Sequence, residues 1–183
     1  MTDIPSAALA PTTILWHKPP DVAVQVMLDK AFEGMTEKNR APSDRSGIPI
    51  ASPHFKNLVC ATQLETGASG LVVFTQDFAV KRKLIRDSAF MEHEIIVDIA
   101  GAVSDEQLYA LNRPQVKVAL NKQTDTITGL RFAIKGYAAG SIAAQCERMG
   151  LIIEGMKRLR VGRMPLSSLK IGEWRFLMGY ERF

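Results

Sequence analysis

The chain has 183 residues, a formal net charge of +4 and two cysteines, which is typical of one soluble domain. Cys60 and Cys146 lack Cys-x-x-Cys or Cys/His spacing, so neither a disulfide scaffold nor a zinc site is indicated. No apolar stretch approaches the roughly 20 residues that cross a bilayer, and the N-terminus does not resemble a secretory signal. We therefore expect a cytoplasmic protein with a flexible segment over residues 1–12 and one domain over residues 13–183.

The first half of the chain predicts short strands separated by helices and a long loop. Residues 12–18 are extended and apolar, and helical spacing follows Asp21, which is a plausible N-cap. Residues 35–56 contain three prolines and no periodicity, which predicts a long loop. Two further extended segments, 58–65 and 69–77, flank a turn.

The second half of the chain alternates helix and strand signals. Asp77 is the expected N-cap of a helix, and Ser104 with Gln107 forms a possible capping box. The remaining predicted elements are strands at 94–101, 116–121, 130–137 and 156–163, and helices at 105–112 and 141–150. Because this alternation is irregular, we predict an α+β fold with a mixed, mainly antiparallel sheet and flanking helices.

Basic residues gather in two stretches, which favours an anionic partner. One stretch follows Asp77, and the other runs from Arg148 to Arg175. Within the second stretch, over residues 156–163, basic and apolar side chains alternate with the period of two typical of a strand. Either stretch alone is typical of a solvated surface, but the two together favour nucleic acid. The expected RNA-binding residues are Lys81, Arg82, Lys83, Arg86, Arg158, Arg160 and Arg163.

Four segments of the chain match known motifs in a fixed order. ILWHKPPD resembles an opening strand with an N-K-P motif, QLETGASGLVVFTQD resembles R-L-D-x-D-T-S-G-L-L-L-L-T-N-D, and MEHEIIVDI resembles E-K-E-Y-L-V. The stretch from Ser141 resembles R-Q-I-R-R-M-C-E-x-x-G, followed by L-x-R-x-R and L-x-x-L-x-x-G-x-W-R-x-L. The match spans residues 13–177, and these segments together resemble the RNA pseudouridine synthases that modify ribosomal RNA.

The resemblance implies a fold, a reaction and a partner. The fold would be a mixed sheet with helices around an RNA cleft, and the reaction would isomerise uridine to pseudouridine after the nucleotide is flipped out of the RNA. No cofactor or metal would be needed, the partner would be structured RNA such as ribosomal RNA, and DNA is not expected. This branch often carries an N-terminal RNA-binding module of the ribosomal-protein S4 type, which we expect to be absent here.

Four positions that resemble the family's catalytic site carry other residues. Glu65 stands at the position of the catalytic aspartate and Gln63 at an arginine two residues earlier. Ile95 stands at the position of a tyrosine, and Ala143 at that of an arginine that would pair with the carboxylate. An aliphatic side chain can pack on uracil but cannot transfer a proton.

These replacements leave three hypotheses. The chain could be an RNA-binding protein with weak or lost turnover. It could instead be a working isomerase that uses Glu65, with Arg148 or His93 standing in for a missing group. A third possibility is a protein-interaction module that reuses the fold without binding RNA.

Three further residue types have structural interpretations. Trp174 should be buried against Leu166, Leu169 and Leu177, with Gly172 also structural. His17 and His54 are expected at the surface or in turns.

Overall fold

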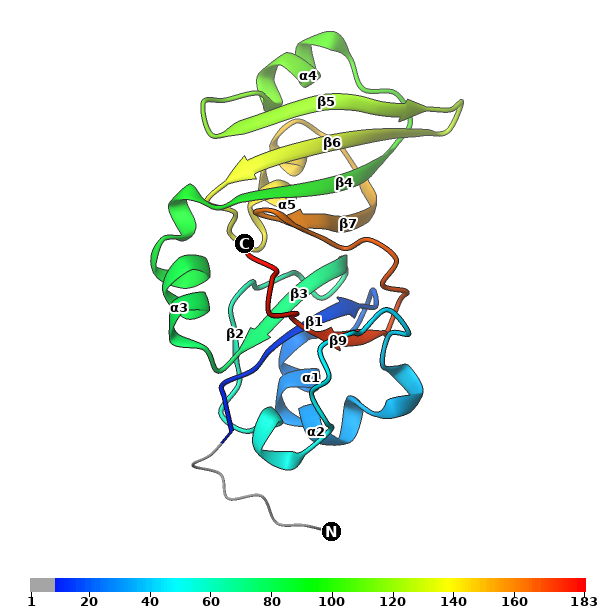
Figure 1. Ribbon diagram of the computed structural model, residues 1–183. Coiled ribbons are helices and arrows are strands. Elements are labelled where there is room, and N and C mark those ends of the chain that lie inside the picture. The colour runs from blue at the N-terminus through cyan, green and yellow to red at the C-terminus, as the bar shows by residue number, and fades with distance from the viewer. Residues whose placement is uncertain (1–8) are drawn as a thin grey trace.

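The computed structural model describes residues 9–183, and its strands form one nine-stranded mixed sheet. The strands are β1 (Thr13–Lys18), β2 (Val59–Cys60), β3 (Ser69–Thr75), β4 (Glu92–Ala100), β5 (Val116–Gln123), β6 (Ile127–Lys135), β7 (Ile153–Val161), β8 (Met164–Pro165) and β9 (Trp174–Phe176). Their order is β5-β6-β4-β7-β3-β1-β9, with β2 beside β3 and β8 beside β7 (Figure 1). β3 and β7 are parallel, whereas the other paired strands are antiparallel. The predicted α+β class with a mainly antiparallel sheet is confirmed.

Short helices flank the sheet. They are α1 (Val24–Asp29), α2 (Ala31–Gly34), η2 (Glu37–Asn39), η3 (Ser52–Phe55), α3 (Phe78–Lys81), η4 (Arg82–Arg86), η5 (Ser88–Phe90), α4 (Asp105–Leu111) and α5 (Ser141–Arg148). The side chain of Asp77 accepts a hydrogen bond from the Val80 N–H and caps α3, as expected, and the capping box of Ser104 and Gln107 is present at the start of α4. Asp21 is not an N-cap, because it adopts a left-handed backbone with φ of 62° and α1 begins only after Ala23.

Trp174 is fully buried, as predicted, but its neighbours differ from those expected. Its ring centroid lies 5.2 Å from that of Phe176 and 5.7 Å from that of Phe55. Leu166 and Leu169 belong to another core cluster, which contains alternate residues of β1 and β3. Because successive strand residues point to opposite faces of a sheet, the two clusters lie on opposite faces. The predicted contacts of Trp174 are therefore wrong.

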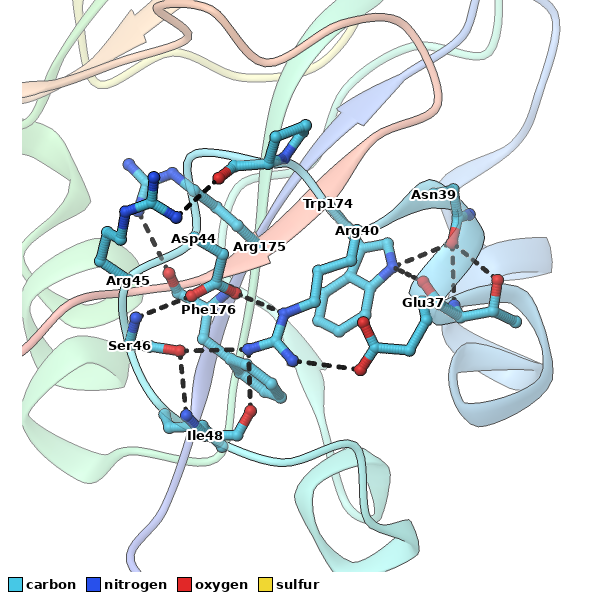
Figure 2. Close-up of polar contacts among 12 residues, drawn as sticks. Glu37, Asn39, Arg40, Asp44, Arg45, Ser46, Ile48, Trp174, Arg175 and Phe176 are labelled. Carbon is cyan, nitrogen blue, oxygen red and sulfur yellow. Dashed lines mark hydrogen bonds and ion pairs between the residues drawn. The ribbon is translucent and has the colours of Figure 1, made fainter.

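The loop over residues 35–56 is mostly irregular, as predicted, but it is held firmly against β9 (Figure 2). Arg40 is its anchor: the guanidinium bonds Asp44 Oδ2 at 2.9 Å and the Ile48 carbonyl at 2.8 Å. The same group lies 5.7 Å from the ring centroid of Trp174 and 5.4 Å from that of Phe176, at cation–π distance. The loop thus covers one face of the edge strand β9.

The histidines expected at the surface are buried instead. His17 lies on β1, an interior strand, and its Nδ1 is 2.7 Å from the Leu169 carbonyl oxygen. His54 packs edge-on against Phe176, with ring centroids 5.8 Å apart. The surface position expected for these rings is wrong, because the strand and the loop that carry them are covered on the side that the rings face. His54 does lie in a turn, the short 3-10 helix η3.

The N-terminal segment that was expected to be flexible is described in part, from residue 9 onward. Residues 1–8 of the expected flexible segment lie outside the described residues, whereas Thr12 is buried and its N–H donates to Gln76 Oε1 at 3.0 Å. No helix in residues 9–183 is long and apolar enough to span a membrane.

Candidate active site

Glu65 lies in the loop before β3, and both of its carboxylate oxygens are hydrogen-bonded. Oε2 accepts from the hydroxyl of Tyr137, and Oε1 accepts from the N–H of Gly140 at 2.6 Å. Gly140 precedes α5 with φ of 87°, a left-handed conformation that glycine adopts readily. No ion pair to Glu65 occurs in the described part of the chain. The carboxylate therefore joins two loops, and within residues 9–183 no arginine lies at ion-pair distance from it.

Lys18, at the end of β1, fixes the turn that follows Glu65. Its ammonium group is buried and donates to the carbonyls of Thr66 at 2.7 Å, Ala68 at 2.5 Å and Pro19 at 2.9 Å. Burial disfavours the charged form and lowers the pKa of Lys18 to about 8. Lys18 thus holds the backbone on the C-terminal side of Glu65.

Arg158 fixes the backbone on the other side of Glu65. Its guanidinium donates to the carbonyls of Thr62 at 2.7 Å, Gln63 at 2.9 Å and Leu71 at 2.7 Å. It also lies 5.8 Å from the ring centroid of Tyr137. Burial lowers the pKa of Arg158 to about 10, so the side chain is still cationic at neutral pH.

The expectation that Arg158 lies on a polar, RNA-facing side of its strand is wrong, because the residue is fully buried. β7 pairs with β4 and β3 along its two edges, and the Arg158 side chain is covered by Tyr137 and by the segment 62–71 whose carbonyls it bonds. The strands approach so closely that a Cβ on Gly70 would lie 2.3 Å from the Arg158 carbonyl oxygen. This contact explains the glycine in the Ser-Gly-Leu segment.

A cavity of about 410 Å³ adjoins Tyr137. His93 lies in its wall, with its ring centroid 5.4 Å from that of Tyr137, and His93 Nδ1 is buried without a hydrogen-bond partner in the described residues. Burial and the nearby guanidinium of Arg158 lower the pKa of His93 to about 3, so the imidazole is neutral at pH 7. The other lining residues are Cys60, Ala61, Thr62, Gln63, Leu84, Ile85, Ser88, Ala138 and Ala139.

The Tyr137–Glu65 contact defines what this site can do chemically. Burial and the adjacent carboxylate raise the pKa of Tyr137 far above its usual value, so the hydroxyl keeps its proton and donates it in a hydrogen bond. Each carboxylate oxygen of Glu65 accepts one hydrogen bond and keeps a further lone pair. Tyr137 lines the cavity, whereas Glu65 is not among the lining residues, which include no carboxylate.

The other predicted catalytic positions do not meet at Glu65. The Gln63 side chain is exposed, and only its carbonyl oxygen is used, by Arg158. Ile95 is fully buried in a core cluster with Phe132. Ala143 is exposed on α5, so from this segment it is the backbone of Gly140 that reaches the carboxylate. The roles assigned to these positions by resemblance remain predictions.

Apart from the buried Arg158, the predicted RNA-binding residues are either paired with acidic side chains or exposed on the surface. Arg160 is half-buried and bonds Glu92 at 2.7 Å and Glu94 at 3.1 Å, so it is paired within the protein. The others apart from Arg158 lie on the surface: Lys81, Arg82, Lys83 and Arg86 on α3 and η4, and Arg163 between β7 and β8.

Sequence reasoning missed Tyr137. Its only signal was its position three residues before Gly140, within a segment that otherwise lacks polar groups. Lys18 was part of a recognised motif, but its three carbonyl partners could not be inferred from spacing.

No group of three or more His, Cys, Asp or Glu side chains in residues 9–183 is arranged to hold a metal ion.

The amino-acid sequence is similar to those of curated RNA pseudouridine synthases. The dual-specificity RNA pseudouridine synthases RluF of Shigella flexneri and Escherichia coli O157:H7 are 23% identical over 145 residues, covering 75% of this chain and 49% of theirs. The chain thus spans about half the length of the curated relatives it matches. No family model matches.

Solved structures share the fold. The crystal structure of a pseudouridylate synthase superposes with a TM-score of 0.69 at 18% identity, covering 92% of this chain and 71% of that one. Human RNA pseudouridylate synthase domain containing 1 gives a TM-score of 0.56 at 9% identity, covering 99% and 86%. The structure of an H/ACA RNP bound to a substrate RNA containing 2'-deoxyuridine gives 0.53 at 11% identity, covering 84% and 48%.

Proposed function

Since the chain is a homologue of the RNA pseudouridine synthases and has their fold, we propose that it binds structured RNA, with ribosomal RNA favoured, and has weak or lost isomerase turnover. The observation that carries this proposal is the Glu65 carboxylate, which has both oxygens bonded to Tyr137 and Gly140 and has no arginine partner in the described residues. These contacts hold the carboxylate between Tyr137 and the turn before α5, and Glu65 is not among the residues that line the cavity at Tyr137.

The surface supports the binding half of the proposal. The basic residues of α3 and η4 make no ion pairs in residues 9–183, so their charges remain available to phosphates. Phosphate contacts dominate the affinity of proteins for nucleic acids and make it depend on salt.

Turnover is tested by tritium release from 5-tritiated uridine in ribosomal RNA. We expect negligible turnover by the parent and by Glu65→Asp, because groups that act as a unit are strongly non-additive. A combined variant, with Gln63→Arg, Glu65→Asp, Ile95→Tyr and Ala143→Arg, is the change that could restore it. Because Ile95 is fully buried, thermal unfolding of that variant must be measured first.

A specific observation favours an active isomerase as the second candidate. The Tyr137 hydroxyl contacts Glu65 at the edge of a cavity, so it could transfer a proton in place of the tyrosine that the family motif puts at position 95. Multiple turnover by the parent that is abolished by both Glu65→Ala and Tyr137→Phe would establish this candidate and overturn the first.

Binding is tested by titrating ribosomal RNA fragments at several salt concentrations. We expect affinity to fall steeply between 50 and 200 mM salt, as when several phosphates are contacted. The absence of binding at low salt would leave the protein-interaction module as the remaining hypothesis.

A further inference from the structure

The helix formed by α3 and η4, together with η5, exposes large apolar side chains among basic ones. Phe78 is 77% exposed and Phe90 is 83% exposed, and Ile85 is also on the surface. Arg82 and Arg86 lie on the same helix, one and two turns beyond Phe78, and are exposed as well. We name these five residues the rim face.

The opposite side of this helix is anchored in the protein. Leu84 is buried in a core cluster with Leu15 and Val73, and Val80 packs against the same cluster. The helix is therefore fixed in place by its inner side, while the rim face contacts no other core cluster. The backbone that carries Phe78 is thus fixed by packing, as a binding platform requires, and Phe90 follows in the adjoining η5.

The rim face is continuous with the cavity beside Glu65. Ile85 belongs to the rim face and also lines the cavity, together with Leu84 and Ser88 from the same segment and Tyr137 from the opposite wall. In Figure 1 this helix lies beside the sheet, next to the end of β4 where η5 leads into that strand. The rim face therefore borders this cavity at Ile85, which is the rim-face residue among those that line it.

The combination of charges and rings selects the kind of ligand. Arg82 and Arg86 have no acidic partner within ion-pair distance in residues 9–183, so they complement a polyanion. Proteins bind single-stranded nucleic acid by placing basic groups along the backbone and stacking bases on aromatic rings. Phe78 and Arg86 are eight residues apart along the α-helix α3 and the π-helix η4 that continues it, so this face can contact several phosphates or bases of one strand.

We propose that the rim face binds the unstacked, single-stranded RNA that flanks the nucleotide in the cavity, with Phe78 and Phe90 as base-stacking platforms and Arg82 and Arg86 on the phosphates. The proposal rests on the RNA binding proposed above and adds the form of RNA and the residues that read it. Neither ring was assigned a role by the sequence patterns or by the resemblance.

The test compares two kinds of variant on a single-stranded ribosomal RNA fragment and on a duplex of the same sequence. Phe78→Ala and Phe90→Ala should each weaken single-strand binding about 5- to 150-fold, with an unchanged salt slope and a smaller effect on the duplex. Arg82→Gln and Arg86→Gln should each reduce the salt slope by about 0.7 on the single strand. Tyr109→Ala is the matched control, because this tyrosine of α4 is 84% exposed and lies outside the rim face.

The outcomes separate this proposal from the proposed function. If the parent binds RNA and both phenylalanine variants bind it equally well, the rim face is not the platform, and the proposed function stands. If the parent binds no RNA at low salt, both proposals fail. Loss of self-association in the phenylalanine variants, measured by sedimentation with RNA affinity unchanged, would overturn the RNA assignment in favour of a protein partner.

Discussion

At the scale of single residues, the Glu65–Tyr137 pair combines a structural and a chemical role. The pair joins the loop before β3 to the segment before α5, which are 72 residues apart in the chain. A contact between such distant segments contributes to stability whether or not the site turns over. Stability measurements on this pair are therefore informative without a substrate.

We expect Tyr137→Phe to lower the free energy of unfolding by about 1.5 to 3 kcal/mol, the range for a hydrogen bond to a charged group. Urea unfolding followed by circular dichroism measures it. Tyr109→Phe, which removes a hydroxyl from an exposed ring, should leave the midpoint unchanged. An unchanged midpoint for Tyr137→Phe as well would show that the hydroxyl does not bond Glu65 in solution.

Sequence reasoning could locate Glu65 but not its partners. The Ser-Gly-Leu segment fixes the position of the carboxylate, and the physical need for Gly70 there is now visible in its close approach to Arg158. The hydroxyl that reaches Glu65 comes from Tyr137, whose position depends on how the segment before α5 folds back. No local periodicity in the sequence predicts that this segment folds back towards Glu65.

At the scale of elements, β7 shows what a strand pattern can and cannot predict. The alternation of basic and apolar residues correctly predicts a strand, but it does not reveal that β7 lies between β4 and β3. The Arg158 side chain is buried against the segment 62–71, where it binds three carbonyls, whereas Arg163 lies beyond the strand and is exposed. Two basic residues of one motif thus have different roles.

Arg158→Lys should lower the free energy of unfolding by about 2 to 4 kcal/mol. A lysine ammonium group cannot reproduce the planar guanidinium that donates to three carbonyls, so some of these buried carbonyls would lose their hydrogen bond. Chemical denaturation provides the measurement. Arg163→Lys is the control and should change stability by less than about 0.5 kcal/mol. Equal stability of both variants would contradict the buried position of Arg158.

β9 contributes to stability mainly through Trp174. We expect Trp174→Ala to cost about 3 to 5 kcal/mol, because the ring packs against Phe55 and Phe176 beneath Arg40. Thermal melting measures the loss. Tyr180→Ala removes an exposed aromatic ring close by in the sequence and should melt like the parent; a Trp174→Ala protein that did the same would show that this part of the core is misplaced.

At the scale of the whole molecule, the sequence predicts the class of the sheet but not its order. Alternating patterns predict most of the strands, whereas the pairing of Ile14 with Phe176 joins residues that no local signal connects. The histidines illustrate the same limit, because all three lie on segments that other parts of the chain cover.

These buried histidines make stability depend on pH. Burial lowers the pKa of His17 and His54, and that of His93 to about 3. Below pH 6.5 the unfolded chain takes up protons that the folded chain does not, so the free energy of unfolding should fall progressively from about pH 6.5 towards pH 3. Urea midpoints at successive pH values measure this slope.

The control for the pH prediction is His93→Gln, which removes one titrating ring. Its stability should depend less steeply on pH between 6.5 and 3 than that of the parent. If the pH dependence of stability were the same for the two proteins, His93 would bind its proton equally well in the folded and unfolded chains. The ring would then not be buried as described.

The adjacency of β1 and β9 also determines when the protein can fold during its synthesis. The partner residues 174–176 are made some 160 residues after β1, an interval of roughly 8 to 30 s at ordinary rates of translation. Throughout that interval Ile14 and Trp16 lack the strand that completes their core. The nascent chain therefore carries exposed apolar surface for many seconds, which makes it a natural client for chaperones at the ribosome.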